Sequence, residues 1–456
     1  MKKITDNKNA AELLQSLAGE FAVIKNPEYI HPAFELAPLA PKLTSPLRSL
    51  TAAVMDMDGT TTTTEELCIH SLEFMVRRMS GKYTTAEWSG LDHTLDYPNI
   101  IGNSTTKHVE YLLSKYHPLL DQTEVKRSFL FAAVWTIISG VDHKRKEEVT
   151  VNLTNLRLSE LMRSPFVTEL ASSPESIAVR EQEIGGTLLK QFGGLFPELN
   201  RTDLVKLGID IYYQRYHAIL QRIKRGESRQ ISSELFNDPE KRLIQPMPGI
   251  LIFLSLIKGW LGNEAENVVP HLLNEYEQKS GKSFAGTDIA ELRRRINALS
   301  AAFGKVPVKT SIVTSSIFYE ADIVMGEVFS VLSEQLKSLP LSDERKSSIA
   351  QRLEHYRNTY DAFITASDST EIRLKPHRDL YSIALHQMNV PVSDFGNVIG
   401  FEDSESGTIA IRAAGIGRCI AVPFAQTKGH NFEAATLVCA GGVPEVVLEH
   451  NVFFAP

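Results

Sequence analysis

Apolar and polar positions follow two different patterns along this chain. Short runs rich in apolar residues recur near the start and in the last third, and most of them end in small or charged residues. Such runs, with apolar side chains on both faces, are typical of strands buried in a parallel sheet. We therefore predict strands at residues 52–55, 308–313, 362–365, 398–401 and 419–422.

Residues 66–244 show helical spacing instead, as at Leu72, Met75 and Val76. Side chains three and four positions apart lie on one face of a helix. No run in this segment has the character of a strand, so we predict a large helical insert, which we interpret as a cap domain. Residues 129–141 form its most apolar stretch, and we expect them to be its buried axis.

Strands that alternate with helices predict an α/β fold, a Rossmann-like, doubly wound parallel sheet. We assign this catalytic core to residues 49–65 and 245–456, with further helical inserts at about 263–304 and 320–358. Residues 1–48 are predicted to be an N-terminal helical extension that continues as an irregular stretch, because prolines are frequent in its second half.

Composition and charge exclude several classes of protein. The 456 residues are 43% hydrophobic and 23% charged, which is typical of a soluble globular protein. A net charge of −7 argues against nucleic acid or an anionic membrane as the main partner. The three cysteines form no CxxC pair, and no apolar run is long enough to span a membrane. The N-terminus lacks the apolar segment of a secretory signal, so we expect a cytoplasmic protein.

Candidate chemistry begins where the first predicted strand ends, in the run Asp56-Met57-Asp58-Gly59-Thr60. The carboxyl ends of parallel strands are where open α/β sheets bind their ligands. One carboxylate and a backbone carbonyl can hold Mg²⁺ here, while the second carboxylate is free to transfer a proton. The alternative reading is a capped turn without chemistry.

Two further segments could act on a phosphate group. Thr314-Ser315-Ser316 follows the second predicted strand, where a hydroxyl and backbone N–H groups suit a phosphate oxygen, although such a run is also a common helix cap. Lys375 precedes Pro376 at the start of a predicted helix and could offset the charge of a carboxylate and a phosphoryl group. The alternative for this residue is a surface lysine.

A second pair of acids, Glu402 and Asp403, ends the strand predicted at 398–401. Paired carboxylates at a strand end are ligands for a hard cation, or alternatively an acidic helix N-terminus. Each of these four motifs is weak alone, but they occur in order, each at or just past a predicted strand. Together they resemble the haloacid dehalogenase superfamily of phosphohydrolases, and most closely its beta-phosphoglucomutase-like phosphatase branch.

The resemblance implies a role for each residue that matches a family motif. Asp56 matches the nucleophile that becomes an aspartyl-phosphate, and Asp58 matches the general acid and base. Thr314 and the backbone N–H of Ser315 match the groups that bind the transferring phosphoryl group. Lys375 matches the lysine that screens the nucleophile from the phosphoryl oxygens.

The resemblance also implies Mg²⁺ as the cofactor. Asp403 matches the metal ligand of the fourth motif, alongside Asp56 and the carbonyl of Asp58. Glu402 is either a second metal ligand or a partner of the ligands. Without a cation and Lys375, the nucleophile and a phosphate dianion would repel each other.

The sequence departs from the family pattern next to the first motif. The chain continues as Thr61 to Glu65 where the family often carries an Asp-Ser pair, and the insert after it is more than twice the usual size of a cap. The run 101–104 resembles the family's cap loop, but the arginine that a mutase places after it is absent. Lys107 is the candidate that could replace this arginine, whereas we interpret His70 as a structural residue.

We therefore predict a Mg²⁺-dependent phosphatase that hydrolyses a small phosphomonoester, a phosphosugar or similar metabolite, through an aspartyl-phosphate. The alternatives are a phosphosugar mutase of the beta-phosphoglucomutase type and a non-catalytic binding or regulatory protein on the same fold. The complete motif set argues against the last of these. The sequence leaves the oligomeric state open.

Overall fold

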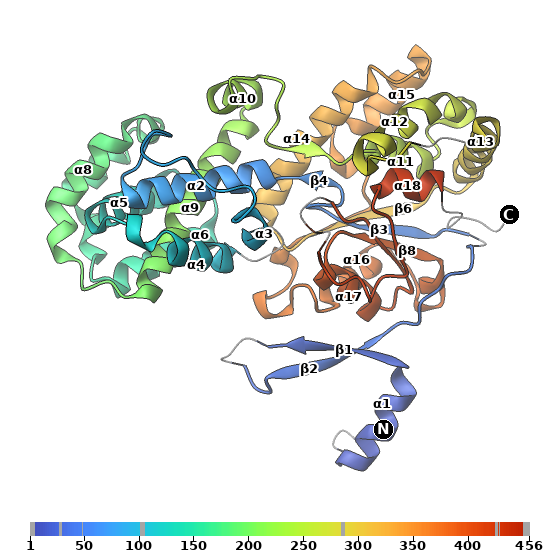
Figure 1. Cartoon of the computed structure of the whole chain (residues 1–456), viewed down its shortest axis with the longest axis horizontal. Helices are drawn as coiled ribbons and strands as arrows, with labels where there is room; N and C mark the ends of the chain where they lie inside the picture. The colour runs from blue at the N-terminus through green and yellow to red at the C-terminus, as the bar shows by residue number, and fades with distance from the viewer. Residues whose placement is uncertain are drawn as a thin grey trace. The chain divides into compact units, whose positions relative to one another are not determined.

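A parallel sheet and a group of helices occupy different parts of the chain (Figure 1). The computed structural model describes residues 5–26, 30–47, 49–100, 105–283, 288–424, 427 and 429–449. The chain divides into two compact units. The first combines Met1–Thr63 with Ile244–Pro456, and the second is Thr64–Leu243.

The first unit is built on a six-stranded parallel sheet with the order β10-β9-β8-β3-β6-β7. The chain moves from β3 out to β7 on one side, and then from β8 out to β10 on the other. The direction therefore reverses between β3 and β8, which are neighbours, and this is the switch point of a doubly wound sheet. The strands are β3 (Ala52–Asp56), β6 (Lys309–Val313), β7 (Ala362–Ile364), β8 (Val398–Glu402), β9 (Arg418–Ala421) and β10 (Leu437–Val438).

The predicted α/β class and all five predicted strands are confirmed, and β10 is an addition. Every residue of β3 and β8 is buried, because helices cover both faces of the sheet. One face packs against α16 (Asp379–Gln387) and α17 (Glu405–Ala413). On the opposite face, α11 (Ile250–Ile257) places Phe253 edge-on against Phe401 of β8.

The remaining helices of this unit fall mainly in the segments that were predicted as inserts. They are α12 (Val269–Ser280), α13 (Ile289–Lys305), α14 (Phe318–Leu336), α15 (Asp343–Leu353) and α18 (Gly442–Leu448). Two short strands, β4 (Thr62–Thr63) and β5 (Gln245–Pro246), pair where the chain leaves this unit and where it returns. The sequence did not predict this pair, which is too short to leave an apolar pattern.

The N-terminal prediction is correct for the helix and wrong for the irregular stretch after it. Helix α1 (Asn7–Leu17) leads into an antiparallel ribbon of β1 (Glu20–Lys25) and β2 (Phe34–Leu39). Pro38 lies within β2 and is tolerated there, because a strand of a two-stranded ribbon needs to donate hydrogen bonds on one side only.

The second unit is helical in all the parts that the structure describes, as predicted. Its buried axis is α5, which packs against α2, α6, α8 and α9 and contains most of the apolar run 129–141. Its helices are α2 (Glu65–Ser80), α3 (Tyr97–Ile100), α4 (Thr105–Lys115), α5 (Gln122–Ser139), α6 (His143–Asn155), α7 (Pro165–Leu170), α8 (Glu181–Phe192), α9 (Arg201–Lys224) and α10 (Ser228–Phe236). Residues 101–104, the predicted cap loop, lie outside the described residues. No described helix of either unit combines the length and apolar character needed to cross a membrane.

Candidate active site

The strand β3 ends at Asp56, and a tight turn comes directly after it. The N–H groups of Thr61 and Thr62 both donate to the carbonyl of Met57, each at 2.9 Å. Gly59 has a φ of +83°, and a Cβ at this position would lie 2.5 Å from Oδ2 of Asp403. Glycine therefore serves both the left-handed turn and the close approach of a carboxylate from the neighbouring strand.

The side chain of Lys375 reaches this strand end from the loop before α16. Its Nζ contacts Oδ1 of Asp56, lies 2.7 Å from Oε1 of Glu402, and donates to the carbonyl of Val313 at 3.1 Å. Burial by itself would lower the pKa of Lys375, but the charges of Asp56 and Glu402 raise it above its ordinary value. The lysine is therefore a buried, charged ammonium and not the surface residue of the alternative reading.

Glu402, the last residue of β8, is completely buried and surrounded by donors. Its Oε1 accepts from the Tyr381 hydroxyl at 2.9 Å, in addition to the contact with Lys375. Its Oε2 accepts from the hydroxyl of Ser404 at 2.9 Å and from the backbone N–H of Asp403 at 3.2 Å. The carboxylate therefore links Lys375 to the start of α17.

Asp403 joins Asp56 and Glu402 in a cluster of three buried carboxyl groups. One oxygen from each lies within 4.8 Å of the others. Burial is the main cause that raises the pKa of Asp56 well above its ordinary value, and the charge of Glu402 adds to it, whereas Lys375 opposes the shift. Two of the three acids, Asp56 and Glu402, contact the ammonium of Lys375. An all-oxygen set of this size fits a hard divalent cation such as Mg²⁺.

The second aspartate of the first motif has a different environment. Asp58 is only partly buried, and its Oδ2 accepts a hydrogen bond from the hydroxyl of Ser316 at 3.2 Å. The backbone N–H of Ser316 in turn donates to Oγ1 of Thr314 at 3.0 Å. Thr314 is buried at the end of β6, whereas Ser315 is exposed. The hydroxyl run thus lies beside the acid motif.

The contacts bring together Asp56, Lys375, Glu402 and Asp403, and separately place Asp58 beside the run that begins at Thr314. The sheet explains this, because β6, β3 and β8 are adjacent and their carboxyl ends meet at one edge. The predicted residue Lys107 is exposed on α4 of the helical unit. Ser316 and Tyr381 lie inside the predicted motifs, but the sequence analysis did not predict them as site residues. In the sequence, each is marked only by a hydroxyl group near a predicted site residue.

His70 of the helical unit has a structural role, in agreement with its interpretation from sequence. Its Nε2 faces the guanidinium of Arg215, with Nη2 of that residue at 3.0 Å. Burial, with a smaller effect of the Arg215 charge, lowers the pKa of His70 to about 3. The imidazole is therefore neutral and does not act as a titrating group near neutral pH.

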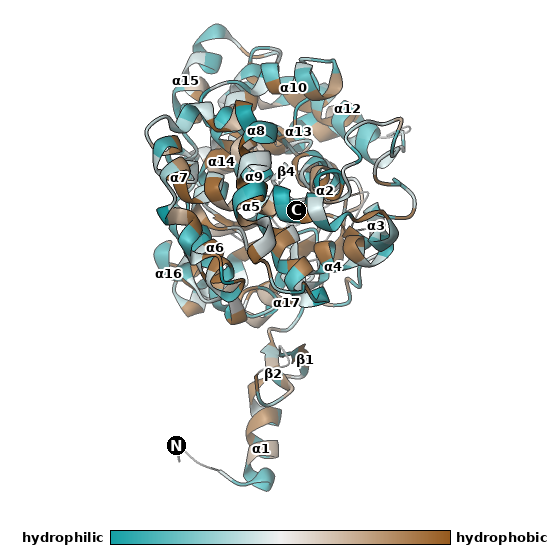
Figure 2. Ribbon diagram, turned by 90° about the vertical axis from the view of Figure 1, so that its left-hand side faces the viewer, coloured by the Kyte–Doolittle hydropathy of each residue, from teal (hydrophilic) through white to brown (hydrophobic). Residues whose placement is uncertain are grey.

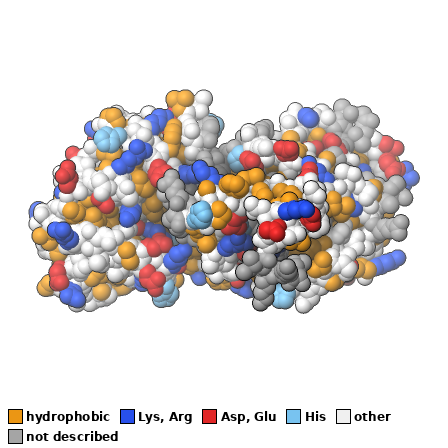
Figure 3. Space-filling model, turned by 90° about the horizontal axis from the view of Figure 1, so that it is seen from below, with side chains coloured by type: hydrophobic (Ala, Val, Ile, Leu, Met, Phe, Trp, Pro, Cys, Tyr) orange, Lys and Arg blue, Asp and Glu red, His pale blue; other side chains and the backbone are white. Residues whose placement is uncertain are grey.

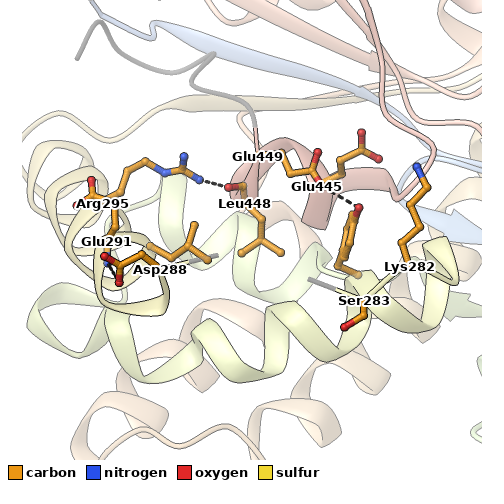
Figure 4. A pocket seen from close by; sticks show the side chains of 10 residues that line it. Lys282, Ser283, Asp288, Glu291, Arg295, Glu445, Leu448 and Glu449 are labelled. Atoms are coloured by element: carbon orange, nitrogen blue, oxygen red, sulfur yellow. Dashed lines mark hydrogen bonds between the residues drawn. The ribbon is translucent and has the colours of Figure 1, made fainter. Parts of the chain in front are cut away.

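A cavity of about 600 Å³ lies between α12, α13 and α18 and does not include the carboxylate cluster (Figure 4). Arg295 spans part of it and donates to the carbonyl of Val447 at 2.7 Å. The hydroxyl of Tyr276 donates to Glu449 at 2.7 Å. The side chains of Arg295, Glu445 and Glu449 in its walls already bond to protein groups, so we place the active site at the strand ends and not here.

No protein-family model and no curated protein match the chain. Among solved structures, the chain is similar to CbbY from Rhodobacter sphaeroides in complex with phosphate, with 14% identity, 88% of this chain and 99% of that chain covered, and a TM-score of 0.37. It is also similar to a putative phosphoglycolate phosphatase from Lactobacillus delbrueckii subsp. bulgaricus, with 15% identity, 88% and 99% coverage, and a TM-score of 0.32. A putative beta-phosphoglucomutase from Thermotoga maritima has 16% identity, 88% and 97% coverage, and a TM-score of 0.31.

Identities and TM-scores at this level do not identify an activity. The functional argument therefore rests on the sheet and on the residues at its carboxyl edge.

Proposed function

We propose that this protein is a Mg²⁺-dependent phosphatase that hydrolyses a small phosphomonoester through an aspartyl-phosphate on Asp56. The observation that carries this proposal is the contact network at the carboxyl edge of the sheet. It joins a buried aspartate, a buried ammonium and a cluster of three carboxyl groups, and a second aspartate comes two residues later.

In the first step, a carboxylate oxygen of Asp56 attacks phosphorus and the ester P–O bond breaks. Asp58 gives its proton to the departing oxygen and becomes a carboxylate. Its partial exposure and its hydrogen bond from Ser316 suit this role, because both let the group reach a substrate while its position is fixed. Lys375 offsets the negative charge of Asp56 and of the phosphoryl oxygens.

In the second step, water replaces the alcohol. Asp58 takes a proton from the water molecule as it attacks phosphorus, the bond between phosphorus and Asp56 breaks, and inorganic phosphate leaves. Asp58 is then protonated and Asp56 is again a carboxylate, so the cycle closes. The buried hydroxyl of Thr314 and the N–H of Ser315 bind the phosphoryl oxygens in both steps.

Asp56, Asp403 and the carbonyl of Asp58 would hold Mg²⁺, which when bound stabilises negative charge on the phosphoryl oxygens. Glu402 has a different function in this proposal. Both of its oxygens already accept hydrogen bonds from the protein, so it positions Lys375 and the start of α17 and is not a direct ligand.

The test is hydrolysis of p-nitrophenyl phosphate with and without Mg²⁺. We expect turnover that requires the metal, and a loss of at least about a thousandfold in Asp56→Asn, because the amide is not a nucleophile. Asp379→Asn is a matched control, since Asp379 lies in the lysine motif but pairs with Arg373. It should keep full activity. If a broad panel of phosphate esters showed no turnover with Mg²⁺, the non-catalytic alternative would replace the proposal.

A further inference from the structure

The N-terminal ribbon carries apolar side chains on both of its faces. On the inner face, Ala22, Ile24 and Leu39 form a small core with Ala413 of α17. The outer face carries the side chains that alternate with these, and Lys25 is a charged residue among them. Val23 is 67% exposed, and its register partner Leu36 and the nearby Phe34 are also exposed. A ribbon that only covered α17 would carry polar side chains on this outer face.

Helix α1 also exposes apolar side chains to solvent. Its apolar residues have helical spacing, yet the helix has no buried residue, and both Leu13 and Leu17 are exposed. Brown, hydrophobic residues are visible on α1 and on the ribbon (Figure 2). Seen from below, orange side chains lie among blue and red ones near the middle of the view (Figure 3). An amphipathic helix with an uncovered apolar stripe is incomplete as a monomer surface.

The ribbon is nevertheless fixed to the catalytic unit. The guanidinium of Arg412 on α17 is buried, and it contacts Glu20 and the carbonyl of Ala40. The N–H of Ala40 donates to the carbonyl of Arg412 at 3.0 Å. Glu35 of β2 pairs with Arg373 at 3.3 Å. The outer face is therefore presented to solvent by a specific docking of the inner face, and not by fraying of a loose terminus.

The area of this surface is near the lower limit of what a dimer needs. Leu13, Leu17, Val23, Phe34 and Leu36 together expose roughly 500 Å², about the size of the largest apolar patch on a typical monomer, and such a patch often has a function. If the same patch on a second copy covered it, the two copies would bury about 1,000 Å², which is close to the lower limit for a specific interface.

We propose that α1 and the outer face of the β1–β2 ribbon bind the same surface of a second copy of this chain, in a dimer with two-fold symmetry. A two-fold interface uses one patch twice, so it needs a surface that does not repel itself. Helix α1 carries one base, Lys8, and one acid, Glu12, and the outer face of the ribbon adds the single base Lys25, so the surface carries little charge that would repel a second copy. A surface for anionic lipid would instead be strongly basic. This interface extends beyond the proposed phosphatase reaction.

The test is the mass of the full-length protein in solution, measured by sedimentation velocity over a range of concentrations. We expect a species of about twice the 50.8 kDa monomer mass. The double variant Val23→Lys/Leu36→Lys should sediment as a monomer, because it places two charges on each copy of the face. Its far-UV circular dichroism and its phosphatase activity should match the wild type, since neither residue belongs to the active site.

The matched control is Val306→Lys/Val392→Lys, which changes two exposed valines of the same unit outside the ribbon. This variant should remain a dimer. A monomeric wild type at about 100 μM would overturn the proposal, and so would a double ribbon variant that stays dimeric. If the monomer instead floated with anionic vesicles, the face would bind lipid, which also contradicts the proposal.

Discussion

A single glycine, Gly407, permits the arrangement around Glu402. The buried carboxyl group of Glu402 occupies the position that a side chain at 407 would take, because a Cβ there would lie 1.8 Å from Oε1. The N–H of Gly407 donates to the hydroxyl of Ser404, which itself donates to Glu402. The start of α17 and the position of the acid are therefore set by the same few atoms.

We expect Gly407→Ala to push the Glu402 carboxylate away from Lys375. The cost of such overpacking in the free energy of unfolding is about 1–3 kcal/mol, and activity should fall because Lys375 loses a partner. Chemical denaturation and turnover of an aryl phosphate measure the two effects. Gly326→Ala is the control, since Gly326 is an exposed position of α14 with nothing within 4 Å. That variant should be more stable by about 0.5–1 kcal/mol. An equally stable and active Gly407→Ala would show that the contact is not needed.

Several residues of the candidate site could be predicted from the sequence, because pairs of acidic residues are rare at the ends of strands. Paired acids such as Asp56 with Asp58, and Glu402 with Asp403, stand out after an apolar strand. Ser316 did not, because a serine after a strand is usually a helix cap and only its contact with Asp58 distinguishes it. The role proposed for Glu402 rests on its hydrogen-bond partners, which are a property of the three-dimensional structure and are not visible in the sequence.

At the scale of the elements, helix α12 contains a carboxyl group, that of Glu275, which is buried with one oxygen lacking a hydrogen-bond partner among the described residues. Glu275 accepts a hydrogen bond from the backbone N–H of Gly249, but its Oε2 is buried without a partner in the part of the chain that the structure describes. Burial raises the pKa of Glu275 to about 7. A carboxylate at this position therefore opposes the packing of α12 against its neighbours.

This raised pKa predicts how stability depends on pH. The folded state binds the Glu275 proton more tightly than the unfolded state, so stability falls as the pH rises from about 4.5 to 7 and stays lower above that range. Glu275→Gln should remove this loss and stabilise the protein at pH 8 by of the order of 1–3 kcal/mol. Denaturation at pH 5 and pH 8 measures the difference. Glu277→Gln, on the exposed side of the same helix, is the control. An unchanged pH dependence in Glu275→Gln would contradict the prediction.

Elements whose own residues carry a clear pattern were predicted correctly, whereas an element that depends on distant parts of the chain was missed. The strands β3 and β8 are buried on both faces, so nearly continuous apolar runs revealed them. The β1–β2 ribbon was missed because Pro38 and its neighbouring prolines suggested irregular chain. Its existence depends on pairing with a distant strand and on docking against α17, and neither leaves a mark on the local sequence.

At the scale of the whole molecule, the candidate site occupies only a small part of the chain. The sequence motifs that resemble the phosphohydrolase superfamily cover the sheet and its edge, whereas the helices of the second unit and of the predicted inserts match no motif. The division at Thr63 and Ile244 places nine of the described α-helices in a second unit. The excess of acidic over basic residues gives a net charge of −7, and three of the acids, Asp56, Glu402 and Asp403, lie together at the edge of the sheet. The substrate depends on residues outside the motifs, and sequence alone does not identify it.

We propose that Asp56 receives a phosphoryl group with the help of a divalent cation. Beryllium fluoride imitates that group on an aspartate, and its binding requires no knowledge of the substrate. The most direct test is therefore ¹⁹F NMR of the full-length protein with beryllium fluoride and Mg²⁺. We expect bound fluoride resonances in the wild type that disappear in Asp56→Asn and when Mg²⁺ is removed. Resonances that persist in Asp56→Asn, or a wild type that binds nothing at saturating Mg²⁺, would contradict the claim.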